Sequence, residues 1–139
     1  MSSMGINLLG VKKLSIPHKF DILTGKRTIS LTTYYKSGKS VSTPVEYVRS
    51  DDKLYVSTPE ASYKVKRIRG NSTAVIASCS MRGKITGPNI DVQVRILSEE
   101  EGKVAQELVD VLFQGLFRQT LLKLRSRGKK EKRVILEIT

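Results

Sequence analysis

Short segments in which apolar and polar side chains alternate give this sequence its strongest structural signal. Residues 28–34 alternate with a period of two, which suits a strand with one buried face. Residues 41–48 and 54–58 repeat the pattern, and turn-forming residues separate the three segments, so we predict an antiparallel meander. Pro44 interrupts the second segment. Because proline cannot donate to a ladder of hydrogen bonds, this strand should lie at a sheet edge or open toward a ligand.

After residue 60 the sequence predicts helices as well as strands. Residues 62–69 have helical spacing, with Ser62 placed to cap the helix. Ser98 and Glu101 match a capping box, and an apolar stripe follows that should face the barrel or a partner. The stripe comprises Val104, Leu108, Val111 and Leu112. The other predicted elements are strands over 74–80, 85–97 (with a bulge at Gly87-Pro88) and 134–138, and a helix over 116–128.

The predicted order is β-β-β-α-β-β-α-α-β. Six antiparallel strands of this kind usually close into a small barrel, so the expected fold class is mainly β (α+β), a six-stranded antiparallel barrel with flanking helices. A length of 139 residues suits one domain, and 39% hydrophobic residues suffice for one core. The formal net charge of +12 makes this a folded basic protein.

The residues that usually carry catalysis or bind metals are scarce. His18 is the only histidine and Cys79 the only cysteine, so a disulfide scaffold and a zinc module are excluded, and we assign no catalytic side chain and no metal ligand. Cys79 lies in an apolar segment and is expected in the core. We find no signal sequence and no apolar run of membrane-spanning length, and therefore expect a cytoplasmic protein that does not bind a membrane.

One strand-turn-helix unit combines hydroxyl groups with positive charges. Thr58, Ser62, Lys64 and Arg67 lie close in sequence around a predicted helix start. The backbone N–H groups at a helix start attract anions, and a phosphate fits this chemistry. The alternative is a solvated cationic helix face on which Ser62 is a routine cap.

Five sequence segments carry a resemblance to a known family: residues 25–34, 38–45, 54–59, 62–67 and 82–88. Taken together, they resemble the split-barrel flavin and deazaflavin reductases of the pyridoxamine-phosphate-oxidase-like superfamily. The resemblance is greatest to the branch that depends on coenzyme F420, and it covers residues 20–139, which leaves residues 1–19 as an N-terminal extension.

This resemblance implies an FMN-binding type of split barrel that forms a homodimer, with a flavin-type cofactor at the dimer interface. It implies that the ring or ribityl chain meets Ser42, Thr43, Pro44 and Val45. It also implies that the phosphate is bound by Thr58, Ser62 and Lys64, with Lys66 or Arg67 as helpers.

The sequence departs from the family in two places. Glu46 stands where relatives often carry an aromatic residue, which affects the expected substrate pocket. The C-terminal Arg-x-His pattern of true pyridoxamine phosphate oxidases is missing from residues 133–139, so vitamin B6 oxidation is not expected.

The leading functional hypothesis is an oxidoreductase that binds coenzyme F420 and transfers a hydride to a small organic acceptor. The net charge of +12 suits a cofactor with a phosphate and several carboxylates better than FMN. The alternatives are an FMN-binding flavoprotein, a flavin carrier without turnover and a basic nucleic-acid-binding barrel. Against the last, only 6% of residues are aromatic and the tyrosines are not expected to cluster with the cations, so no specific nucleic-acid partner is predicted.

Overall fold

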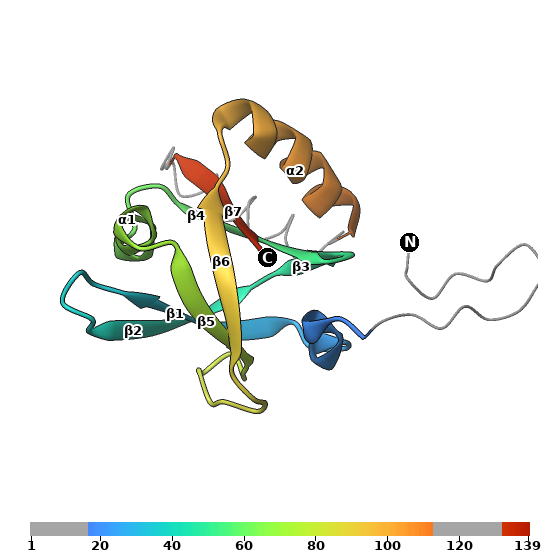
Figure 1. The fold of residues 1–139 in the computed structure, drawn as a ribbon. Helices are drawn as coiled ribbons and strands as arrows, with labels where there is room; N and C mark the ends of the chain where they lie inside the picture. The colour runs from blue at the N-terminus through green and yellow to red at the C-terminus, as the bar shows by residue number, and fades with distance from the viewer. Residues whose placement is uncertain (1–16, 113–131) are drawn as a thin grey trace, which may run out of the picture.

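The computed structural model describes residues 17–112 and 132–139 as one curled antiparallel sheet with helices around it (Figure 1). The strands follow the order β2-β1-β5-β6-β7-β4-β3 across the sheet. In chain order the elements are the 3₁₀ helix η1 (Lys19–Leu23), β1 (Thr28–Tyr34), β2 (Ser40–Glu46), β3 (Val48–Ser50), β4 (Lys53–Pro59), α1 (Tyr63–Gly70), β5 (Thr73–Ser78), β6 (Ile90–Ile96), α2 (Glu99–Leu112) and β7 (Arg133–Ile138).

The expected class, mainly β with antiparallel pairing, is confirmed: the sheet forms a half-barrel. The predicted count of six strands is wrong, because the segment 41–48 forms two strands, β2 and β3. Tyr47 separates them. Its buried hydroxyl donates to the carbonyl oxygens of Leu23 at 3.0 Å and Lys26 at 2.8 Å, which anchors the chain where it leaves one strand and enters the next.

The two antiparallel pairings of the predicted meander are confirmed, but its middle segment does not run through as one strand. β1 and β2 form one hairpin and β3 and β4 another, but β2 and β3 lie at opposite ends of the sheet. β1 takes β5 as its second neighbour, and β4 takes β7. The edge position expected from Pro44 is confirmed, since β2 pairs only with β1. A period of two fixes which face of a strand is buried, and it says nothing about distant partners.

The strand predicted over residues 85–97 is shorter than expected. β6 begins at Ile90, so Gly87-Pro88 lies in the preceding loop and makes no bulge. Ile85 instead forms an isolated bridge with Cys79. A turn at Gly83, with φ +88°, lets the chain fold back there, and the amide of Ser80 donates to the Lys84 carbonyl at 2.8 Å.

α2 packs on the outer side of the sheet beside β7 (Figure 1). The capping box is confirmed: the Ser98 amide donates to Glu101 Oε1 at 3.1 Å, and the Glu101 amide donates to Ser98 Oγ at 3.2 Å. Of the predicted apolar stripe, Val104 is 70% exposed and Leu108 is half-buried, whereas Ala105 and Val109 are buried. The sheet therefore contacts the side of α2 that carries Ala105 and Val109.

The core lies inside the curl of the sheet. β4 and β6 alternate between buried and more exposed residues, as the period-two pattern requires. The helix η1 closes one part of this core with Phe20, and His18 caps η1 by accepting the Phe20 amide at Nδ1. The inward residues of the strands are Ile29, Leu31, Leu54, Val56, Ala74, Ile76, Ile90, Val92, Val94, Leu136 and Ile138.

Replacing Tyr47 with phenylalanine should lower the free energy of unfolding by about 1–2 kcal/mol, because two backbone carbonyls lose a buried donor. Burial raises the pKa of Tyr47, so the folded state favours the neutral phenol. This difference in pKa contributes stability that is fully present below the unfolded-state pKa near 10. The contribution is lost as the pH rises through the folded-state pKa. The gap between wild type and Tyr47→Phe should therefore narrow above pH ~10.

Urea unfolding followed by circular dichroism measures this difference. Tyr63→Phe is the matched control, because the Tyr63 side chain is 72% exposed and loses no buried bond. An equal loss in both variants would contradict the role given to Tyr47.

The helix predicted over 116–128 lies outside the described residues, and the domain boundary between residues 19 and 20 stays a prediction. Within 17–112 and 132–139, no helix is long and apolar enough to cross a membrane. The same ranges contain no group of three His, Cys, Asp or Glu side chains that could hold a metal ion.

Candidate functional site

The start of α1 is the first part of the predicted site. β4 ends at Pro59, and the chain turns there because the Ser62 amide donates to the Pro59 carbonyl at 3.1 Å. Ser62 then occupies the N-cap position, but its side chain makes no capping hydrogen bond. The amides of the first helical turn have no acceptor within the helix. The interpretation of Ser62 as a routine cap is therefore wrong, and the helix start keeps its donors for another group.

Two hydroxyl groups at this place are buried and unsatisfied. Thr58 is 2% exposed on the inner side of β4, and its Oγ1 has no hydrogen-bond partner. The Oγ of Ser62 is likewise buried without a partner. An unsatisfied buried polar group costs about 1–3 kcal/mol, so two of them close together in sequence are unusual for purely structural residues.

Lys64 brings positive charge to the same helix start. Its side chain is half-buried, and no described carboxylate lies within ion-pair distance of it. Burial lowers the pKa of Lys64, and the neighbouring Arg133 and Arg67 lower this pKa further. The cost of keeping Lys64 charged would be relieved by a bound anion.

Arg67 and Arg133 are held in place by polar contacts of their own. Arg67 is buried, and its Nε donates to Thr33 Oγ1 at 2.7 Å. Arg133 stands opposite Pro59 in the β4–β7 pairing, and its Nε donates to Ser57 Oγ at 3.1 Å. The sequence prediction missed Arg133, because only the strand pairing brings it to a helix start that lies far away in the sequence.

The predicted ring-binding residues lie on the edge strand β2 but do not share one face. Ser42 and Pro44 are exposed on one side, and the Ser42 hydroxyl is hydrogen-bonded to Thr32 Oγ1 at 2.7 Å. Thr43 and Val45 are half-buried on the other side, where Val45 packs against the core. β2 also touches β4, the strand that carries Thr58, although the two strands are not paired.

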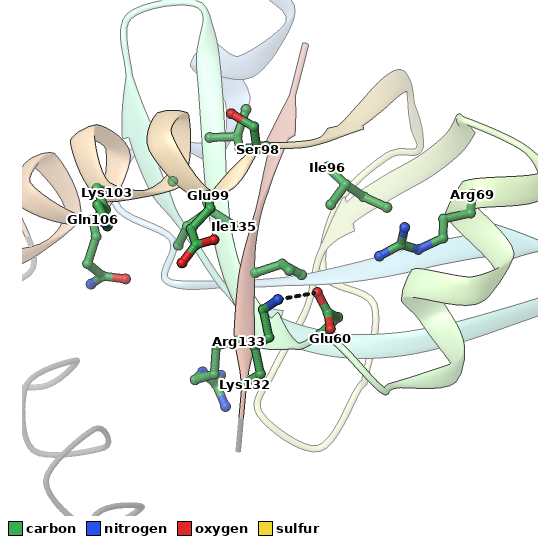
Figure 2. A pocket seen from close by; sticks show the side chains of 13 residues that line it. Glu60, Arg69, Ile96, Ser98, Glu99, Lys103, Gln106, Lys132, Arg133 and Ile135 are labelled. Carbon is green, nitrogen blue, oxygen red and sulfur yellow. Dashed lines mark ion pairs between the residues drawn. The ribbon is translucent and has the colours of Figure 1, made fainter. Parts of the chain in front are cut away.

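One cavity, with a volume of about 500 Å³, lies at the first turn of α2 (Figure 2). Its wall includes the cations Arg69, Lys103 and Arg133, and an ion pair of 3.5 Å between Lys132 and Glu60. Two other cavities lie over β5 and β6 and between α1 and the β1–β2 turn. Of the predicted site residues, Arg67 and Lys66 line the last of these cavities.

His18 and Cys79 have structural roles. The backbone amide of His18 donates to Asp21 Oδ2 at 2.8 Å, and the His18 ring lies 4.9 Å from that of Phe20, so this histidine belongs to the capping of η1. Cys79 is buried, as expected, and burial raises the pKa of its thiol. A raised pKa keeps a thiol protonated and unreactive at neutral pH.

The expectation that the tyrosines stay apart from the cations is wrong. Tyr34, Tyr35 and Tyr63 line one cavity together with cationic side chains. The cations are Lys36, Lys66 and Arg67. The turn between β1 and β2 meets α1 here, a contact that the sequence did not indicate.

Comparisons with known proteins identify the fold. No protein-family model matches the sequence, and no curated protein sequence matches it. A proposed pyridoxamine 5′-phosphate oxidase from Listeria innocua matches with a TM-score of 0.57 and 12% identity, over 86% of this chain and 88% of that chain. An FAD-binding protein from Mesorhizobium loti gives 0.58 and 17%, over 85% and 83%. An F420 reductase gives 0.53 and 14%, over 88% and 94%.

At this level of identity the similarity concerns the fold. The chain has the split-barrel fold of the pyridoxamine 5′-phosphate oxidase-like proteins, as the sequence motifs indicated. Proteins with this fold include ones named for binding FAD and for F420 reduction.

Proposed function

We propose that this protein is an oxidoreductase that binds coenzyme F420 and transfers a hydride between the cofactor ring and a small organic acceptor. The observation that carries the proposal is the pair of buried, unsatisfied hydroxyls of Thr58 and Ser62 beside the half-buried Lys64. A phosphate group accepts hydrogen bonds from both hydroxyls and from the first-turn amides of α1, and Lys64 neutralises its charge. The residues therefore fit the phosphate of a flavin-type cofactor.

The ring is assigned to the edge strand β2. Its outer backbone groups are unpaired, because β2 has β1 as its single neighbour in the described sheet. Ser42 and Pro44 offer an exposed surface, while Thr43 and Val45 offer a half-buried one. Either side of the strand can meet a ring that lies along its edge. Arg67 acts as a helper that adds positive charge near the phosphate from a fixed position.

The cofactor, when bound, supplies the hydride chemistry. The residues of this chain bind the phosphate, orient the ring along β2 and keep water from the inner side of the strand. No described side chain is assigned the role of acid or base: the hydride would move directly between ring and acceptor, and the proton that completes the reduction of the acceptor would come from solvent.

The choice of F420 over FMN depends on charge. A protein with a net charge of +12 favours a cofactor that carries carboxylates in addition to its phosphate. A fluorescence titration with each cofactor should show tighter binding of F420. Tighter binding of FMN would select the FMN flavoprotein instead, and no binding of either would end the redox proposal.

A steady-state assay of acceptor reduction distinguishes an enzyme from a protein that only stores the cofactor. With a quinone, enone or biliverdin-like acceptor, an enzyme raises the rate of reduction above that of the cofactor alone. A carrier binds the cofactor with the same affinity and leaves that rate unchanged.

We also propose a homodimer with the cofactor at the interface, in a cytoplasmic protein. The supporting observation is that Ser42 and Pro44 lie on an exposed strand face, so that a second copy would be needed to enclose the ring. The exposed Val104 on α2 is a further apolar residue available to a partner. Light scattering at micromolar concentration should give twice the monomer mass, and a monomer would contradict the interface site.

A further inference from the structure

A second candidate site lies between α1 and the turn that joins β1 to β2. We call it the tyrosine cavity, and its volume is about 190 Å³. Its residues are Tyr34, Tyr35, Lys36, Tyr63, Lys66, Arg67 and Gly70. Except for Arg67, none of them belongs to the proposed cofactor site.

Two tyrosine rings of this cavity each have a cation on one side and solvent on another. Arg67 lies over the Tyr35 ring with its Cζ 5.3 Å from the ring centroid, and this ring is 43% exposed. Lys66 Nζ lies 5.3 Å from the centroid of the Tyr63 ring, which is 72% exposed. Because Arg67 is also bonded to Thr33, the Tyr35 ring is held against a fixed guanidinium. Large exposed aromatic surfaces of this kind mark a place where another flat group can stack.

The charge of the cavity selects an anionic ligand. Three of its lining residues are cations and none is a carboxylate. The aliphatic chain of Lys36 passes close to Gly70, since a Cβ built on Gly70 would lie 3.9 Å from Lys36 Cε. This places a second lysine, besides Lys66, beside the tyrosine rings.

The size of the cavity limits its ligand to a single ring system. Sites for drug-sized ligands have volumes of about 300–1,000 Å³, so a cavity of about 190 Å³ holds a fragment of a ligand. A flat ring that stacks on tyrosine and carries a negatively charged group nearby is the chemistry of a nucleotide. We propose that the tyrosine cavity binds the base of a free nucleotide, with the phosphate held by Lys36 and Lys66.

A free nucleotide fits better than single-stranded nucleic acid. Proteins that bind single strands use a row of aromatic side chains on which successive bases stack. Here the exposed rings of Tyr35 and Tyr63 converge on one small cavity. The site therefore accepts a single base. This inference does not depend on the proposed redox function.

Calorimetric titration of the full-length protein with AMP tests the proposal, and ribose 5-phosphate serves as the same ligand without a base. AMP should bind more tightly than ribose 5-phosphate. Tyr63→Ala should weaken AMP binding about 5- to 150-fold, which corresponds to the 1–3 kcal/mol measured for stacking of one base on an aromatic side chain. Tyr63→Phe keeps the ring and should bind AMP within about twofold of wild type.

Lysine variants test the phosphate contact. Lys66→Ala should weaken AMP binding, whereas Lys84→Ala, an exposed lysine in the β5–β6 loop, should not. Lys64→Ala distinguishes this site from the cofactor site, because it should weaken binding of the flavin-type cofactor and leave AMP binding nearly unchanged.

Three results would overturn the proposal. In the first, AMP binds no better than ribose 5-phosphate. In the second, AMP binding is lost in Lys64→Ala and kept in Tyr63→Ala, which would place AMP at the cofactor site. In the third, an oligonucleotide of about 12 nucleotides binds through Tyr63 while AMP does not, which would identify a nucleic-acid surface instead.

Discussion

Lys64→Ala is expected to weaken cofactor binding by about 1.5–3 kcal/mol, roughly 10- to 150-fold, because it removes a charged hydrogen bond to the phosphate. Fluorescence titration with F420 and FMN measures the loss. Lys84→Ala is the matched control, since Lys84 is an exposed lysine in the β5–β6 loop and belongs to no proposed site. Equal losses in the two variants would show that the affinity comes from the overall charge of the protein and not from a site at the start of α1.

Removing the charge of Lys64 has the opposite expected effect on the stability of the ligand-free protein. Because burial, Arg133 and Arg67 lower the pKa of Lys64, its charge opposes folding. This cost is fully present below the folded pKa and disappears above the unfolded value near 10.5. Lys64→Met should therefore make the ligand-free protein at least as stable as wild type at neutral pH. As the pH rises through this range, the free energy of unfolding of wild type should increase relative to that of Lys64→Met.

Thr58→Val is a second variant that should weaken cofactor binding without destabilising the ligand-free protein. Valine has nearly the shape of threonine and removes the unsatisfied hydroxyl, so the ligand-free protein should not lose stability while cofactor binding weakens. A residue that weakens binding when replaced, and yet costs stability when present, belongs to a functional site. A clear loss of stability in Thr58→Val would instead give this hydroxyl a structural role.

Leu136→Ala is expected to lower the free energy of unfolding by about 2–5 kcal/mol. Leu136 is fully buried, and its strand β7 lies between β6 and β4 in the sheet. It stands opposite Ile96 on one side and Val56 on the other, so the cavity left by alanine opens in the centre of the core. A domain of this size has a total stability of about 5–15 kcal/mol, so much of it would be lost.

Urea unfolding followed by circular dichroism measures the effect of Leu136→Ala. Met81→Ala is the control, because this apolar residue is 79% exposed and should change stability by less than about 0.5 kcal/mol. A loss below about 1 kcal/mol in Leu136→Ala would contradict the position of Leu136 in the centre of the core.

Much of the local structure could be predicted from the sequence, because local structure depends on neighbouring residues. Period-two alternation located β1 and β4, and Pro44 correctly indicated an edge strand. Ser98 and Glu101 marked the start of α2. The motifs also indicated the split-barrel fold.

The sequence was less informative wherever the outcome depended on residues far apart. The helix start with Thr58, Ser62 and Lys64 was predicted, but their unsatisfied hydroxyls and crowded charges depend on packing. Arg133 reaches this place through the β4–β7 pairing, which no local pattern specifies. The tyrosine cavity likewise forms only because a hairpin turn meets α1.

By itself, the sequence determined the faces of the strands, the positions of the turns and the excess of positive charge, because each follows from the order of side chains along a short segment. The tertiary structure alone decided which strands are neighbours, which stripe of α2 is buried and which polar groups lack a partner. These depend on contacts between segments distant in the chain, and periodicity within one segment places no restriction on its partner.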